Sequence, residues 1–331
     1  MTVVCSFLLA VGLGFSVGSA AAEYFPESRE TQAQTKAVQT KKVSVGGMPA
    51  GIYMETDGVL ILDTQQIKGI DGKMYEPAQG MVKSGDYIKA VNQKEICGQK
   101  ELLKELEKIV LQAVETAAGE YKLGIWVRDN VQGLGTVTFL TEQNEFGALG
   151  HGIHDTDTNG LMEISGGKLY RTTIQNVVKG SSGNPGTMEG MIVYNRYNLL
   201  GTIEKNTDAG IYGRLDKTEE LFGKKELVET AAKEEIVTGP AKMRCFLEDE
   251  VREFDIEVMK VDQETAEINK GMMIRVTDEE LLEKTGGIIQ GMSGSPILQN
   301  GKLIGAVTHV FVMDSTKGYG IFAETMLEQL K

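Results

Sequence analysis

The sequence contains few cysteines, and this scarcity limits the kinds of site that the chain can build. Three cysteines in 331 residues, Cys5, Cys97 and Cys245, are too few and odd in number for a disulfide scaffold. No CxxC pair or Cys/His spacing typical of a zinc site occurs. Cys5 lies in an apolar run, so Cys97 and Cys245 are either a single bridge or, as we prefer, two small core residues.

Positive charge and proline are also scarce. The chain has 34 Lys and Arg against 47 Asp and Glu, a net charge of −13, which argues against a nucleic-acid partner. Forty glycines against six prolines favour short strands and tight turns over long helices. The hydrophobic fraction of 41% is enough for a sizeable core, and the length suits two domains after an N-terminal segment.

The N-terminus has a long stretch without charge. Residues 3–22 are apolar or small, long enough to cross a membrane, and end in a small-residue pattern before Glu23. No Lys or Arg precedes them, so the usual basic start of a signal peptide is missing. We predict a signal or membrane anchor over residues 1–22, with cleavage and retention both open, and a polar linker over residues 23–42.

The pattern of apolar residues and turns divides the remaining chain into residues 43–118 and 119–331. The first part predicts two strands joined at Asp57-Gly58, a favoured hairpin dipeptide, and an amphipathic helix over residues 99–117. From Tyr121 onward, short β-branched and aromatic runs separated by Gly or Asn predict a mainly β barrel or sandwich. Residues 216–235 are charged and predict a surface helix or an insertion.

Ser293 is the candidate nucleophile. It lies in Gly-Met-Ser-Gly-Ser-Pro, where flanking glycines let a substrate carbonyl approach the backbone. The N–H groups of Gly291 and Ser293 are placed to form an oxyanion hole. A plain Gly/Ser turn is the alternative for this hexapeptide.

A serine nucleophile needs a base, and the chain has three histidines. His151 stands between glycines after an expected strand and is the first choice, whereas His309 lies in an apolar run and is expected to be a packed strand residue. His154, Asp155 and Asp157 follow His151 closely. That cluster suits either a divalent metal ion or a turn in which the aspartates accept hydrogen bonds from their own backbone.

Sequence spacing alone does not identify the carboxylate that would orient the base. Asp278 follows an expected strand and precedes Ser293, whereas Asp155 and Asp157 are near His151 in the sequence. Members of such a triad meet in space and not along the chain, so sequence proximity does not choose between them.

Several long motifs resemble one family. They are "LGHGIHDTDT", "GTMEGMIVYN", "LLGTIEKNTDAGIYG", "TDEELLEKTGGIIQGMSGSPILQNGKLIGAVTHVF" and "GYGIFAETML". Together they resemble the SpoIVB family, the stage IV sporulation serine peptidases of endospore-forming bacteria, from about Gly119 to the C-terminus. The resemblance implies a chymotrypsin-like double β-barrel peptidase domain, preceded by a small α/β PDZ-like domain and an N-terminal hydrophobic segment.

The resemblance also implies a function and its residues. It identifies Ser293 as nucleophile, His151 as base and Asp278 as the orienting carboxylate, and it requires no cofactor or metal. Family members are exported to the intermembrane space around the forespore, cleave themselves, and then cleave a membrane-bound regulator of an intramembrane protease. That cleavage leads to activation of a late mother-cell sigma factor.

Two segments bear on how such a peptidase is regulated. "GMSGSP" is similar to the G-D-S-G-G-P loop of chymotrypsin-like enzymes, but Met292 replaces the Asp that pairs with a new N-terminus on activation, so activation must differ. The stretch Met48, Pro49, Ala50, Gly51 and Ile52 resembles the carboxylate-binding loop of a PDZ domain, which captures peptides by strand addition. The PDZ-like domain lacks an expected strand after its helix.

Two other functions fit the same residues. One is a peptide-binding scaffold whose peptidase part is inactive, and the other is a metal-dependent hydrolase that uses the cluster from His151 to Asp157. Sensitivity to chelators would favour the metal enzyme, and inhibition by serine-directed reagents would exclude it.

Overall fold

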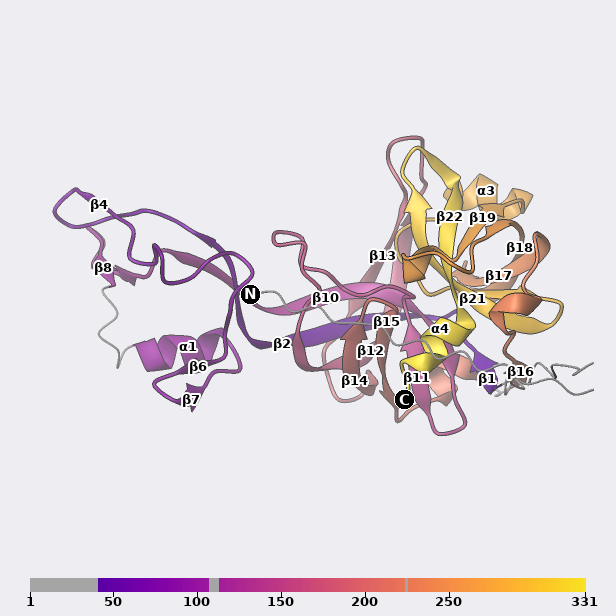
Figure 1. Cartoon of the computed structure of the whole chain (residues 1–331), viewed down its shortest axis with the longest axis horizontal. Coiled ribbons are helices and arrows are strands. Elements are labelled where there is room, and N and C mark those ends of the chain that lie inside the picture. Colours follow the sequence, from indigo (N-terminus) through magenta and orange to yellow (C-terminus); the bar gives the residue numbers. More distant parts are fainter. Residues whose placement is uncertain (1–40, 107–112, 224–225) are drawn as a thin grey trace, which may run out of the picture. The chain divides into compact units, whose positions relative to one another are not determined.

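The computed structural model describes residues 41–106, 113–223 and 226–331 (Figure 1). Four α-helices and two 3-10 helices are described: α1 (Gln99–Leu106), α2 (Glu219–Phe222), α3 (Glu279–Thr285), α4 (Ala323–Glu328), η1 (Lys233–Glu235) and η2 (Ile268–Lys270). The strands are β1 (Lys42–Val45), β2 (Pro49–Thr64), β3 (Ile67–Lys68), β4 (Met74–Tyr75), β5 (Tyr87–Ile88), β6 (Ala90–Val91), β7 (Lys94–Glu95), β8 (Val114–Glu115), β9 (Tyr121–Lys122), β10 (Ile125–Leu140), β11 (Glu145–Ala148), β12 (Ile164–Val178), β13 (Thr187–Ile192), β14 (Leu199–Thr207), β15 (Gly210–Leu215), β16 (Leu227–Glu229), β17 (Gly239–Leu247), β18 (Glu250–Val261), β19 (Met272–Val276), β20 (Pro296–Gln299), β21 (Lys302–Phe311) and β22 (Asp314–Phe322).

The first barrel closes through β2. Strands β10, β11, β15, β14, β12 and β2 are neighbours in that order, and β2 pairs with β10 as well as with β12. All of these pairs are antiparallel, so alternate side chains point inward. The inward set is apolar and buried, including Ile52, Met54, Leu140, Phe146 and Leu169. The ring therefore encloses a packed core.

The second barrel is the closed ring β17-β18-β19-β22-β21-β20, coloured orange to yellow in Figure 1. Its core contains Met243, Val258, Ile274, Ile297 and Val307. A further apolar cluster joins Val43, Phe139 and Tyr212 of the first sheet to Leu303, Ile321 and Met326 of β21, β22 and α4. The mainly β, double-barrel prediction is confirmed by this architecture.

The hairpin predicted at Asp57-Gly58 is wrong, because β2 runs unbroken for 16 residues. Gly58 has φ +97°, and a Cβ there would lie 2.6 Å from the Ile88 carbonyl oxygen. The glycine therefore permits a local kink where the chain passes close to its neighbour. Pairing with β10 on both sides of Gly58 keeps the chain extended.

The helix predicted over residues 99–117 does not extend to residue 117. It is described as α1 over Gln99–Leu106, and residues 107–112 lie outside the described part. Val114–Glu115 form β8, paired with β9 through a turn that contains Gly119 at φ +75°. Among the described residues of 216–235, expected to be a surface helix or an insertion, the four residues of α2 are α-helical, and Leu227–Glu229 pair with β1.

The predicted PDZ peptide-binding loop is not formed. Pro49 to Ile52 lie in β2, and Ala50, Gly51 and Ile52 have neighbours on both β10 and β12. The Met48 carbonyl accepts from the Val137 N–H at 3.1 Å. A strand paired on both edges offers no free row of N–H groups to a carboxylate. The prediction for Met48–Ile52 is therefore wrong, and β1 and β2 belong to the barrel sheet and not to a separate unit ending at residue 118.

The predictions for the cysteines and the N-terminus have different outcomes. Cys97 and Cys245 are both free thiols; Cys245 is buried as expected for a core residue, whereas Cys97 is exposed. The segment of residues 1–22 and most of the predicted linker lie outside the described residues. No helix within the described ranges is long and apolar enough to cross a membrane.

Replacing Ile52 tests whether this segment is barrel core. Its side chain is 1% exposed, so Ile52→Ala should lower the free energy of unfolding by about 2–5 kcal/mol. Ile70→Ala, at a position 66% exposed, is the matched control and should change it by less than about 0.5 kcal/mol. Equilibrium urea unfolding measures both; equal small effects would place Ile52 in a loop.

Candidate active site

Ser293 lies in a turn that presses against the first barrel. Its side chain is partly exposed, and its Oγ donates a hydrogen bond to the Thr308 carbonyl at 2.8 Å. The next residue, Gly294, has φ +94°, and a Cβ there would lie 2.1 Å from the Thr136 carbonyl oxygen on β10. Ser295 is fully buried, so Ser293 is the serine of this turn that a substrate can reach.

The two N–H groups predicted for an oxyanion hole remain available. Gly291 and Ser293 donate to no other backbone or side-chain group within the described part of the chain. Met292, between them, donates to the Ile289 carbonyl at 3.1 Å, and Gly294 donates to the Val307 carbonyl at 2.8 Å. Gly291 has φ +101°, a conformation that favours glycine. The turn thus leaves these two donors unused.

His151 follows β11 through a left-handed turn at Leu149 and Gly150, with φ +69° and +70°. Its Nδ1 lies 2.9 Å from the Gly152 carbonyl oxygen. Because a carbonyl oxygen only accepts, this contact requires the proton on Nδ1 and leaves Nε2 unprotonated. Nε2 is then the atom that can take a proton.

Strand β21 brings the two candidate residues together. The His151 ring lies 4.9 Å, centroid to centroid, from the ring of His309. His309 is the neighbour of Thr308, whose carbonyl holds Ser293. His309 was expected to be a packed strand residue; it lies on β21, but its side chain is exposed and contacts His151.

The surroundings of His151 and His309 favour the neutral form of both imidazoles. Burial lowers the pKa of His151 below its ordinary value of 6.5, and the nearby His154 lowers it further. His309 is exposed as a residue, but its ring lies against that of His151, and partial desolvation of the ring, together with the nearby His151, lowers its pKa to about 4. A neutral imidazole at pH 7 is the form that a general base needs.

Asp278, predicted to orient His151, has another role. It is the N-cap of α3: one carboxylate oxygen accepts from the Leu281 N–H at 3.0 Å, and the other from the Asp255 N–H at 3.2 Å. Its described bonds all stay within the second barrel, and none reaches His151. The structure therefore corrects this assignment, because helix capping occupies the carboxylate.

The two acidic residues that follow His151 in the sequence, Asp155 and Asp157, also have other partners. Arg128 pairs with both Asp155 and Asp157, and Asp155 accepts from the N–H groups of Asp157 and Thr158. This is the backbone-bonded turn, and among the described residues no group of three or more ligands suits a metal ion.

One carboxylate missed in the sequence does reach a histidine of the site. Asp208, in the turn between β14 and β15, has Oδ1 3.8 Å from Nε2 of His154, and His154 Nδ1 lies 3.2 Å from the Gly152 carbonyl. The two histidines thus share one carbonyl acceptor. Asp208 stands in the quoted motif "LLGTIEKNTDAGIYG", but only the pairing of β15 with β11 shows that it lies beside the histidines.

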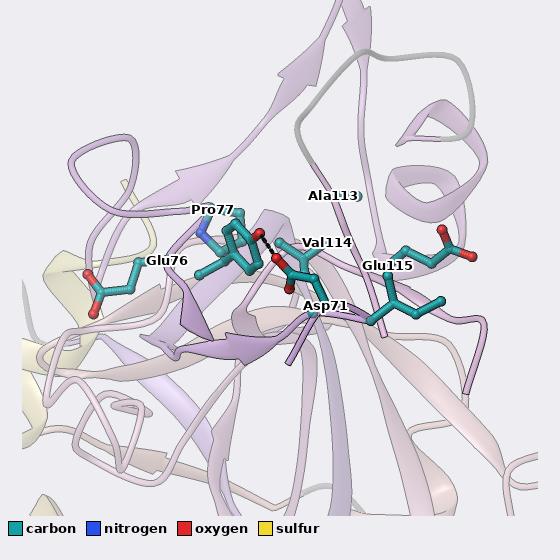
Figure 2. A pocket seen from close by; sticks show the side chains of 9 residues that line it. Asp71, Glu76, Pro77, Ala113, Val114 and Glu115 are labelled. Atoms are coloured by element: carbon teal, nitrogen blue, oxygen red, sulfur yellow. Dashed lines mark hydrogen bonds between the residues drawn. The ribbon is translucent and has the colours of Figure 1, made fainter. Parts of the chain in front are cut away.

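A cavity of about 480 Å³ lies elsewhere, and Figure 2 shows the side chains that line it. Ile70, Pro77 and Val114 supply apolar surface, and Asp71 accepts from the Tyr75 hydroxyl at 2.6 Å. None of the candidate catalytic residues is among the described residues around it. It offers no chemistry that competes with Ser293.

Replacing Asp278 separates capping from catalysis. Asp278→Asn should leave the rate of fluorophosphonate labelling at Ser293 within about threefold, because Asn caps a helix as well as Asp does. The same change in the carboxylate of a Ser-His-Asp triad lowers the rate about 10⁴-fold. Asp278→Ala, the capping control, should cost about 1 kcal/mol of stability. A 10⁴-fold loss with Asn would return Asp278 to the catalytic site.

Comparison with known proteins gives the family. The model of the SpoIVB peptidase S55 family matches residues 119–327. Among solved structures, the active form of the Rv3671c protease from M. tuberculosis is similar at 14% identity, over 61% of this chain and 74% of that chain, with a TM-score of 0.32. The HtrA-type protease AlgW with decapeptide is similar at 12% identity, over 87% and 64%, with a TM-score of 0.36. No curated protein matches. Because the family model spans more than half of the chain, this protein belongs to the SpoIVB peptidase family and is a serine peptidase.

Proposed function

We propose that Ser293 is the nucleophile of this serine peptidase and that His151 is its general base. The observation that carries this proposal is their convergence on two consecutive residues of β21. Ser293 Oγ contacts the Thr308 carbonyl, and the His151 ring contacts the His309 ring. The unused N–H groups of Gly291 and Ser293 lie in the same turn as the nucleophile.

The reaction then follows the covalent route of acyl transfer. Ser293 Oγ leaves the Thr308 carbonyl, gives its proton to His151 Nε2 and attacks the scissile carbonyl carbon. The N–H groups of Gly291 and Ser293 stabilise the oxyanion. His151 passes the proton to the leaving amine, and a water molecule repeats the sequence to release the acid and restore Ser293.

The base is oriented here by a backbone carbonyl. The Gly152 oxygen accepts from Nδ1 of His151 and so fixes the tautomer, a task that the resemblance gave to Asp278. A carbonyl dipole stabilises an imidazolium less than a full negative charge does. The lowered pKa of His151 is consistent with this neutral partner.

The biological role that we propose is the one implied by the family. The chain is exported, anchored by or released from its N-terminal segment, and acts in the intermembrane space around the forespore. There it cleaves itself and then a membrane-bound regulator of an intramembrane protease, which activates a late mother-cell sigma factor. Membership of the SpoIVB family supports this role.

The described part of the structure lacks the features that the two alternative functions, a peptide-binding scaffold and a metal-dependent hydrolase, would need. A peptide-binding scaffold needed the loop Met48–Ile52, which is a barrel strand. A metal-dependent hydrolase needed Asp155 and Asp157, which are bound to Arg128. Neither is proposed further.

Covalent labelling of the full-length protein tests the nucleophile and the base. A fluorophosphonate should modify Ser293, identified by mass spectrometry of the adduct, because its hydroxyl is activated. Ser293→Ala and His151→Ala should each abolish labelling and self-cleavage.

Ser295→Ala is the control, since that hydroxyl is fully buried. It should keep both labelling and self-cleavage. An adduct on Ser295, or self-cleavage that persists in Ser293→Ala, would refute the assignment.

The pH profile of labelling reports how His151 is held. The rate rises as His151 loses its proton, so a pKa lowered by burial predicts an acid-side midpoint below pH 6.5. A carboxylate partner raises the pKa of a histidine and would move the midpoint above that value. Rates measured between pH 4 and 9 distinguish the two; a midpoint above 7 would contradict the carbonyl-held base.

A further inference from the structure

The peptide groups that carry the two oxyanion donors are fixed by contacts on their carbonyl side. In a trans peptide, the C=O and the N–H point in opposite directions, so holding one aims the other. The Met292 carbonyl, on the peptide of the Ser293 N–H, accepts from the Ser295 N–H at 2.9 Å, within the turn itself. The Gln290 carbonyl, on the peptide of the Gly291 N–H, is held from outside the turn.

That outside contact comes from the hairpin of β12 and β13. The Met188 N–H donates to the Gln290 carbonyl at 2.8 Å, and the Gln290 N–H donates to the Gly186 carbonyl at 2.8 Å. Thr187 and Gln290 thus form a parallel bridge between the hairpin and the oxyanion turn. The Met188 side chain, 5% exposed, packs in the same core as Ile289 and Met292.

Strand β10 holds the turn from a second direction. Thr136 Oγ1 donates to the Gly291 carbonyl at 2.8 Å, and the Thr136 N–H donates to the Ser293 carbonyl at 3.0 Å. Thr138 Oγ1 donates to the Gly294 carbonyl at 2.7 Å. These threonines are buried, so their bonds are shielded from water.

The tip of the hairpin is itself fastened to the second barrel. The Gly180 N–H donates to the Thr285 carbonyl, and the Gly183 N–H to the Val312 carbonyl, both at 2.9 Å. Lys179 Nζ adds a bond to the Glu283 carbonyl at 2.6 Å. The hairpin is therefore attached to segments of the second barrel that precede and follow the oxyanion turn in the sequence.

We propose that Met188 of this hairpin and Thr136 of β10 are positioning residues that hold the oxyanion hole in its catalytic form. The Met188 bond to the Gln290 carbonyl aims the Gly291 N–H at the substrate, and the Thr136 hydroxyl fixes the adjoining 291–292 peptide through the Gly291 carbonyl. Together these bonds take the place of the ion pair that Met292 cannot make. Displacement of the hairpin would release the 290–291 peptide to turn over and would remove one of the two donors. The inference rests on the proposed roles of Ser293 and of the Gly291 and Ser293 N–H groups.

The full-length Met188→Pro variant tests this, because proline lacks the N–H that holds Gln290. The limiting rate of fluorophosphonate labelling should fall about 10²–10³-fold, the loss expected for one oxyanion donor, with the half-saturating concentration unchanged. Met188→Leu keeps the N–H and the apolar volume and should stay within a few-fold of the unsubstituted protein.

An isosteric variant provides a second test that does not depend on whether the proline variant folds. Thr136→Val removes only the hydroxyl that holds Gly291 and should lower the limiting rate at least tenfold, whereas Thr136→Ser should restore it. Thr172→Val is the matched control, because the Thr172 hydroxyl bonds Met191 within the same hairpin and touches no part of the turn.

A second chemistry separates positioning from general damage. In a Ser293→Cys background, iodoacetamide alkylates sulfur by displacing iodide and forms no oxyanion, so Met188→Pro should leave that rate unchanged. Equal losses in alkylation and phosphonylation would show a merely structural role and overturn the inference. Undiminished phosphonylation in Met188→Pro and Thr136→Val would also overturn it. If the unsubstituted protein takes no label, the proposed function itself fails, and the inference with it.

Discussion

The close approach of the Ser293 turn to strand β10 is the contact on which the rest of the site depends. A Cβ at Gly294 would lie 2.1 Å from the Thr136 carbonyl, so glycine alone lets the backbones meet. Ser293, the proposed nucleophile, belongs to the second barrel, and His151, the proposed base, follows β11 of the first. Their relation is therefore set by how tightly the barrels pack, and the apolar cluster shared by Phe139, Tyr212 and Ile321 holds that packing.

The electrostatics of this site rely on burial more than on charge. His151 contacts a carbonyl and a second imidazole, and the carboxylates considered as its partner have other roles: Asp155 pairs with Arg128, and Asp278 caps α3. Desolvation keeps the imidazoles neutral and so ready to accept a proton, at the expense of weaker stabilisation of the imidazolium. A base of this kind works in less basic solution than one paired with a carboxylate.

The oxyanion turn is held differently from the corresponding turn of chymotrypsin-like enzymes, where an Asp forms an ion pair with a new N-terminus. Met292 is buried among apolar residues, and the turn is held by backbone bonds from a hairpin whose tip bonds the second barrel. Such bonds are local and reversible, and they depend on where the hairpin lies. If the hairpin positions the oxyanion hole, as we propose, its displacement would change activity without any change in covalent structure.

The sequence by itself determined the mainly β class, and it named Ser293 and His151 as candidates, because glycine-flanked turns and family motifs are local signals. It did not determine the partner of His151, since Asp278 is equally suited to cap a helix and only the fold shows which task it has. Likewise, Met48 to Ile52 has the local pattern of a binding loop. Only the pairing of β2 with β10 and β12, far along the chain, shows that its edges are already filled. Local chemistry names the candidates, and long-range pairing decides which of them meet.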